Sequence, residues 1–128
     1  MSNLVSRITD SEVEVLKVLW KAGVEVPMSF IRERLEETTE WEYSTIKTLL
    51  RRLCKKEVVK SEKKEVYYYE ALVSEEEYND YNTQVLIDRV YSGKAKNLVA
   101  SLLGSKKLNK DDIEELREMF KLDGDKDE

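Results

Sequence analysis

Residues 42–56, EYSTIKTLLRRLCKK, carry the side chains in this chain that are best suited to binding a ligand. At 3.6 residues per turn, a helix through this stretch has two distinct faces. One face combines small hydroxyls with cations and has no acid: Ser44, Lys47, Thr48, Arg51 and Lys55. Lys and Arg neutralise phosphates, and Ser and Thr hydrogen-bond to phosphates or base edges. This face suits a nucleic-acid groove, although the alternative for a lone helix is a solvated cationic surface.

The opposite face of the same helix is apolar and must pack against a core. It consists of Ile46, Leu49, Leu50 and Leu53.

Two helices are predicted before this one. The first spans about residues 10–21, with a capping box of Thr9 and Glu12 and a stop at Gly23. Residues 24–26 are short and extended, and Pro27 then opens a second helix in its first turn that runs to about residue 37. Three helices, the last two joined by a short turn, predict a helix-turn-helix.

Two short β-prone runs follow these helices, at residues 58–61 and 66–69. Residues 62–65 are predicted to be the hairpin turn, with Lys63 and Lys64 at its tip and Lys60 on the preceding strand. The alternatives are an ordinary polar turn for the tip and simple strand packing for the tyrosines at 67–69. Three helices followed by a hairpin with a basic tip is the element order of a winged helix-turn-helix.

The chain after residue 73 is predicted to be helical, with helices at about 74–91, 94–103 and 110–122 and a charged tail at 123–128. Ser74 and Glu77 are predicted to form a capping box at the start of the first of these helices. These helices have too little mass for a core of their own. They either pack back on the winged domain or join a second chain, and we expect the second, because a pair of winged domains reads two half-sites. The predicted dimer contacts are Leu86, Val90, Leu98, Leu102, Ile113, Leu116 and Phe120.

The fold class that follows is mainly α with a small β-hairpin wing. It combines a winged helix-turn-helix at 1–73 with a C-terminal helical dimerisation arm at 74–122.

Composition argues against catalysis. The 128 residues include no histidine, and they contain neither a cysteine cluster nor a glycine-rich phosphate loop. Most metal sites, nucleophile pairs and P-loops are thereby excluded, so we expect no enzyme, no metal and no cofactor. A single cysteine, Cys54, has no partner for an internal disulfide. With no long apolar run and no signal peptide, we expect a cytoplasmic protein that does not insert into a membrane.

The charge distribution favours one local contact with nucleic acid. The formal net charge is −5, yet residues 43–64 contain eight basic and two acidic residues. Residues 1–73 are balanced at 13 of each sign, and residues 74–128 contain 9 basic and 14 acidic residues. An acidic chain with one basic block can still bind DNA through that block, while its other acids weaken non-specific binding.

Several stretches resemble one family, in the same order along the chain. They are ITDSEVEVLKVLW at 8–20, TIKTLLRRLCKK at 45–56, VYYYEALVSEEEY at 66–78, NLVASLL at 97–103 and LNKDDIEELREM at 108–119. Together they resemble the penicillinase repressor (BlaI/MecI/CopY) family of bacterial transcriptional repressors, and within it the BlaI/MecI-like branch. The resemblance implies a homodimeric winged-helix repressor. Such a protein would bind a dyad-symmetric operator on double-stranded DNA and control a β-lactam-resistance-type or related regulon.

Carried over position by position, the resemblance and the helix pattern give one set of candidate DNA-binding residues. The set comprises Tyr43, Ser44, Thr45, Lys47, Thr48, Arg51, Lys60, Lys63 and Lys64. Similar family members usually have a small capping residue where this chain has Glu42, and often a glycine where it has Glu57. The copper-responsive branch carries clustered cysteines near its C-terminus, which this chain lacks, so metal sensing is not expected.

The resemblance also bears on how repression ends. Relatives that respond to β-lactams are released by proteolysis in the dimer arm, triggered by a membrane-bound sensor. The matching position here is Ser101–Leu102, where those relatives tend to have Asn-Phe. A membrane sensor protease or its downstream protease is therefore a candidate partner. Two other functions stay open, a winged-helix module that binds proteins and a winged-helix regulator that responds to a small molecule.

Overall fold

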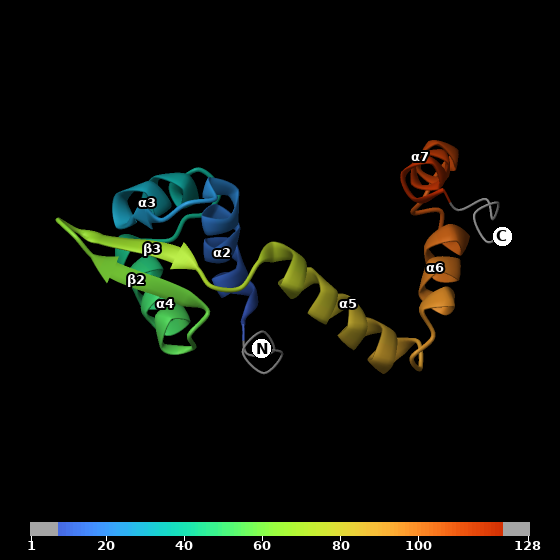
Figure 1. Cartoon of the computed structure of the whole chain (residues 1–128), viewed down its shortest axis with the longest axis horizontal. Coiled ribbons are helices and arrows are strands. Elements are labelled where there is room, and N and C mark those ends of the chain that lie inside the picture. Colours follow the sequence, from blue (N-terminus) through green and yellow to red (C-terminus); the bar gives the residue numbers. More distant parts are fainter. Residues whose placement is uncertain (1–7, 122–128) are drawn as a thin grey trace. The chain divides into compact units, whose positions relative to one another are not determined.

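The computed structural model describes residues 8–121, which fall into two compact units, one ending at Asn82 and the other beginning at Thr83 (Figure 1). The predicted charged tail and residue 122 lie outside the described residues. The elements of the first unit precede a helix that crosses into the second. In chain order the elements of both units are α2 (Asp10–Ala22), β1 (Val26–Pro27), α3 (Met28–Glu36), α4 (Tyr43–Lys55), β2 (Val59–Lys63), β3 (Tyr67–Ala71), α5 (Glu75–Val90), α6 (Ala95–Gly104) and α7 (Lys110–Phe120).

Helix α2 is the centre of the first unit and packs against α3, α4 and β3. The predicted capping box is present: the Glu12 N–H donates to Thr9 Oγ1 at 3.2 Å, and the Thr9 N–H donates to the Glu12 carboxylate at 2.9 Å. Gly23 ends the helix with a φ of 74°, a conformation in which glycine has no Cβ penalty. Both ends of α2 are therefore set by local sequence, as predicted.

Three antiparallel strands form a small sheet in the order β1–β3–β2. The hairpin of β2 and β3 was predicted, but the pairing of β1 was not. Tyr69 in the central strand lies opposite Val26 on one side and Ser61 on the other. Pro27 is the last residue of β1 and the N-cap of α3, so its predicted place inside the first turn of the helix is wrong by one position.

The core of the first unit is one apolar cluster to which every helix from α2 to α4 contributes. Its buried residues are Val15, Leu16, Leu19, Val26, Ile31, Leu35, Ile46, Leu49, Leu50, Leu53, Val58, Val59 and Val73. Figure 1 shows the β2–β3 hairpin extending as a wing beside α3 and α4. The prediction of a mainly helical chain with a winged helix-turn-helix is confirmed.

The start of α5 is anchored to the first unit by a tryptophan. The Trp20 indole N–H donates to the Val73 carbonyl oxygen at 2.8 Å, and its ring centroid lies 5.7 Å from that of Tyr78. Ser74 and Glu77 exchange the predicted capping hydrogen bonds at 3.0 and 2.9 Å. The boundary predicted after residue 73 stays a prediction, while the two compact units divide inside α5.

The second unit contains the rest of α5, α6 and α7. Helix α7 begins with a capping box in which the Asp112 N–H donates to the Asn109 side chain at 2.8 Å. None of the residues in α6 or α7 is buried. These amphipathic helices therefore leave apolar side chains uncovered in the single chain.

Candidate nucleic-acid interface

Helix α4 has a buried face and an exposed cationic face, as the sequence predicts. Ile46, Leu49, Leu50 and Leu53 are buried in the core. On the other side Ser44, Thr45, Lys47 and Arg51 are exposed and Thr48 is half-buried. The helix contains no acidic residue, and Glu42 at its N-cap makes no capping hydrogen bond through its side chain. This geometry presents hydroxyls and cations together on one accessible surface.

The cationic face extends from α4 onto α3 through Tyr43. The Arg32 guanidinium lies 4.9 Å from the centroid of the Tyr43 ring, and the Lys47 ammonium lies 5.9 Å from it. A hollow of about 620 Å³ between α3, Tyr43 and the wing residue Val66 adjoins this arrangement. Sequence reasoning missed Arg32, because its spacing from Glu36 indicates only an ordinary helical ion pair, which the structure also contains at 3.1 Å.

The wing carries Lys60 and Lys64 where they were predicted, but not Lys63. Lys60 and Lys63 both lie on β2, where Lys60 pairs with Glu70 and Lys63 pairs with Tyr67. The turn is therefore shorter than the predicted four residues, and the prediction that Lys63 lies on it is wrong. Strand pairing continues to Lys63, which lies opposite Tyr67, so residues 64–66 close the hairpin.

Lys64 is the wing-tip lysine, and it already has an anionic partner. Its ammonium forms an ion pair with the carboxylate of Glu25, which precedes β1. The hydrogen bond to Glu25 raises the pKa of Lys64. Sequence reasoning could not pair these residues, because it did not place β1 in the sheet. Any phosphate that binds Lys64 must compete with Glu25.

A buried ion pair fixes the end of α4. Glu12 is fully buried, and its two carboxylate oxygens lie 2.7 and 2.9 Å from the Lys56 ammonium. The same carboxylate accepts the Thr9 N–H at the start of α2. One side chain thus joins the first turn of α2 to the C-cap of α4. The capping box predicted a local role for Glu12, and no sequence signal indicated the contact with Lys56.

Glu57 turns the chain from α4 into the wing with a left-handed backbone. Its φ is 67°, its N–H donates to the Cys54 carbonyl oxygen at 3.0 Å, and the Val58 N–H donates to the Leu53 carbonyl oxygen at 3.1 Å. These two bonds form a Schellman motif, in which glycine is the usual left-handed residue. The glutamate is therefore a strained choice at the position that directs β2 away from α4.

Comparison with known proteins identifies relatives over nearly the whole chain. The family model described as Penicillinase repressor matches residues 8–121. The chain belongs to the penicillinase repressor family. The penicillinase repressor of Bacillus licheniformis is 31% identical over 117 residues, which are 91% of each chain. The methicillin resistance regulatory protein MecI of Staphylococcus aureus is 30% identical over 121 residues, 94% of this chain and 98% of its own.

A solved structure of a penicillinase repressor family relative has a similar fold. It is the solution structure of the monomeric form of Bacillus licheniformis BlaI in complex with the blaP half-operator. It is 34% identical in sequence, has a TM-score of 0.50, and covers 56% of this chain and 88% of that one. The relative in that structure is bound to DNA, and the structural similarity covers about half of the present chain.

The second unit of this penicillinase repressor family member exposes apolar side chains at the predicted dimer positions. Val90 is 62% exposed and Phe120 is 59% exposed. Leu86 is also exposed, and Leu98, Leu102, Ile113 and Leu116 are half-buried. Val99, Leu103 and Met119 add to the exposed apolar surface and were not predicted. The candidate cleavage residues Ser101 and Leu102 lie inside helix α6.

Nothing in residues 8–121 is arranged for metal binding or for crossing a membrane. Within this range no group of three or more His, Cys, Asp or Glu side chains could hold a metal ion. No helix there combines the length and hydropathy that a membrane span requires. Burial raises the pKa of the Cys54 thiol, which disfavours the nucleophilic thiolate.

Proposed function

We propose that this chain is a homodimeric transcriptional repressor that binds a dyad-symmetric operator and controls a β-lactam-resistance-type or related set of genes. One observation carries the proposal: the acid-free polar face of α4 is exposed beside a wing that carries three lysines, in a family that has a DNA-bound relative. Family membership and the local basic block support DNA as the partner more than the net charge of −5 opposes it. The site of action is the cytoplasm, with the DNA.

Each candidate residue has a role in the proposed complex. Lys47 and Arg51 enter the major groove, where they bind bases or phosphates, and Ser44 and Thr48 hydrogen-bond beside them. Thr45 lies to one side of the polar face and binds a phosphate. Tyr43 sits at the edge of this face, and the wing lysines Lys60, Lys63 and Lys64 follow the phosphate backbone.

Dimerisation explains the exposed apolar side chains of the second unit. Its helices α6 and α7 have no buried residue in the single chain, and a contiguous apolar surface of this kind indicates a protein partner. A second copy is the natural partner, because two winged units joined by their arms match the symmetry of a dyad operator. In that dimer the two α4 helices lie about 34–36 Å apart, one helical turn of DNA.

Selection from random duplex DNA, followed by footprinting, tests the proposal directly. We expect two half-sites with dyad symmetry and centres about 10 base pairs apart. Arg51→Ala and Lys47→Ala should weaken binding without unfolding the protein. Lys17→Ala is the control, since Lys17 is an exposed cation on α2 that pairs with Glu14.

The same variants separate base contacts from phosphate contacts. Loss of a base contact lowers discrimination by about 1–3 kcal/mol, whereas loss of a phosphate contact lowers the salt slope by about 0.9. If neither Lys47→Ala nor Arg51→Ala changes affinity, α4 is not the reading helix. A protein that selects no DNA sequence at all would refute the proposed function.

Release of repression is proposed to occur by cleavage at Ser101–Leu102, by a membrane sensor protease or its downstream protease. Cutting the arm removes the effective concentration that one bound half-site gives to the other. Because a protease needs an extended substrate, α6 must first unfold locally and leave the dimer interface, since Leu102 is also a proposed dimer contact. Mass spectrometry of the chain in its native host after β-lactam exposure tests this. An intact chain during induction of the target genes would exclude it.

A further inference from the structure

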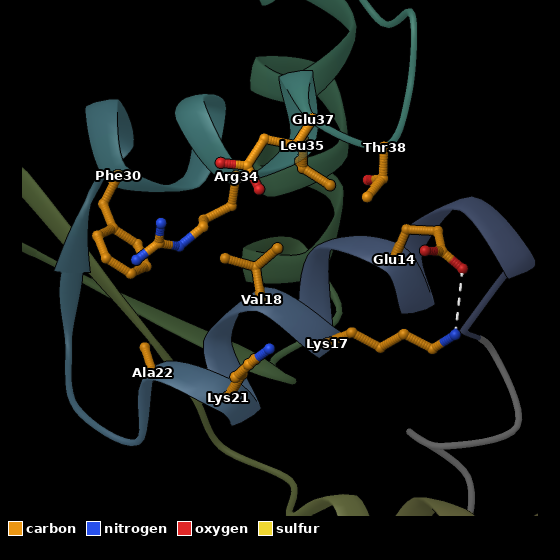
Figure 2. Close-up of a pocket in the computed structure, with 10 residues that line it drawn as sticks. All are labelled: Glu14, Lys17, Val18, Lys21, Ala22, Phe30, Arg34, Leu35, Glu37 and Thr38. Atoms are coloured by element: carbon orange, nitrogen blue, oxygen red, sulfur yellow. Dashed lines mark hydrogen bonds and ion pairs between the residues drawn. The ribbon is translucent and has the colours of Figure 1, made fainter.

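A groove of about 670 Å³ lies between α2 and α3. Figure 2 shows Val18 and Ala22 of α2 facing Phe30 of α3 across it, and Leu35 adds to the apolar lining. Small-molecule sites commonly have volumes of about 300–1,000 Å³ and an apolar lining with a few polar groups. The groove has the volume and the apolar lining of such a site.

Two cations besides Lys17 border this groove. Arg34 from α3 holds its guanidinium 4.3 Å from the centroid of the Phe30 ring. Lys21 comes from the facing helix α2. Neither side chain takes part in an ion pair within residues 8–121, although Glu37 also lines the groove. The groove is lined by three cations, Lys17, Lys21 and Arg34, and by two acids, Glu14 and Glu37. This excess of one cation beside an apolar surface favours an anionic ligand.

The charges are also unevenly placed along the groove. Figure 2 shows Arg34 near the end formed by Phe30 and Ala22, and Glu14 and Thr38 near the other end, while Glu37 extends its carboxylate toward the Arg34 side chain. Glu14 is occupied by Lys17, whose ammonium lies 3.4 Å away. A ligand with one anionic group therefore has a preferred orientation, with its charge toward Arg34 and Lys21.

We propose that this groove binds a small aromatic organic anion. Its carboxylate lies between Lys21 and Arg34, where the guanidinium can bind it through two parallel hydrogen bonds. Its ring packs on Val18, Ala22 and Phe30, removing apolar surface from water. No lining residue belongs to α4 or to the wing strands, so the site is separate from the proposed DNA contacts and does not depend on them.

The experiment is an NMR titration of the full-length, ¹⁵N-labelled protein with 1-naphthoate. The uncharged control ligand is naphthalene-1-carboxamide, which has the same rings. We expect 1-naphthoate to shift the amide signals of Val18, Ala22 and Arg34 and to leave those of α6 and α7 unchanged. The carboxamide should bind about tenfold more weakly, because it lacks the charge that strengthens hydrogen bonds to the cations.

Substitutions test the two cations. Lys21→Gln and Arg34→Gln should each weaken 1-naphthoate binding about tenfold, and neither should alter the fold, since both side chains are exposed. Arg52→Gln, an exposed cation on α4 outside the groove, should leave binding unchanged. Equal binding of the acid and the amide, or unchanged affinity in the double variant Lys21→Gln/Arg34→Gln, overturns the proposal. Shifts confined to α6 and α7 overturn it as well.

Discussion

Replacing Glu12 with glutamine tests whether the buried ion pair holds α4, the proposed DNA-reading helix, in place. Glutamine keeps the shape of the side chain and can still accept the Thr9 N–H, so the capping box survives. What changes is the charge facing Lys56, whose ammonium lies 2.7 and 2.9 Å from the two carboxylate oxygens. The Lys56 side chain is only 18% exposed, so its cation loses its buried counter-charge without gaining full hydration.

The cost follows from this burial. Removing one partner of a buried pair typically costs about 3–5 kcal/mol, because the other charge is left uncompensated. Lys56 is partly exposed and does not interact with Glu12 alone, so Glu12→Gln should cost no more than about 3 kcal/mol, the lower end of that range. Lys56→Met leaves the fully buried carboxylate without its cation and should cost as much or more. The double variant Glu12→Gln/Lys56→Met removes both charges and should cost less than the sum of the single variants.

Chemical denaturation of the four proteins gives the coupling free energy, and operator titrations of the same four report on the position of α4. We expect a coupling of about 1–3 kcal/mol and a loss of specific binding in Glu12→Gln at temperatures where it is still folded. Non-specific DNA binding should change less, because it needs cations but not their exact placement. Additive stability losses would show that the two residues do not act as a pair. Equal losses for specific and non-specific DNA would refute a positioning role.

Four further predictions concern the end of α4, the wing, α3 and the arm. Glu57→Gly should raise the free energy of unfolding by about 1 kcal/mol, measured by denaturant titration, because glycine relieves the left-handed strain at φ 67°; a loss of stability would contradict this. Glu25→Gln should free Lys64 and strengthen binding to non-specific duplex DNA, measured at fixed salt, and weaker binding would oppose it. Arg32→Gln should weaken operator binding and reduce the salt slope by about 0.9, whereas an unchanged slope would place Arg32 off the DNA. A chain ending at Asn82 should sediment as a monomer, and a dimer would move the interface into the first unit.

Elements set by local signals could be predicted from the sequence. The capping boxes at Thr9 and Ser74 and the stop at Gly23 each depend on residues within one helical turn. The amphipathic pattern of α4 also predicted which of its residues are buried, because a single helix determines both faces. The accuracy of these predictions follows from the short range of the interactions that form the elements.

Contacts between distant segments could not be predicted in the same way. Glu12 and Lys56 are 44 residues apart, and Glu25 and Lys64 are 39 apart. Neither separation reflects the repeat of a single helix or strand, so both pairs depend on how separate helices and strands pack. The predicted dimer contacts stay a prediction for another reason. They join two copies of the chain, and the fold of one copy shows only that α6 and α7 have no buried residue.

The acidic residues around the cationic face clarify how a chain of net charge −5 can be selective for DNA. Glu25 holds Lys64 at the wing tip, and Glu36 holds Arg32 beside Tyr43. Each phosphate contact made by these cations must displace a carboxylate, so the net gain per contact is smaller than for a free cation. Weak individual contacts keep a single winged unit from binding arbitrary DNA tightly. Tight binding in the proposed complex then requires base contacts from α4 together with a second half-site, which makes the dimer arm as important for selectivity as the reading helix.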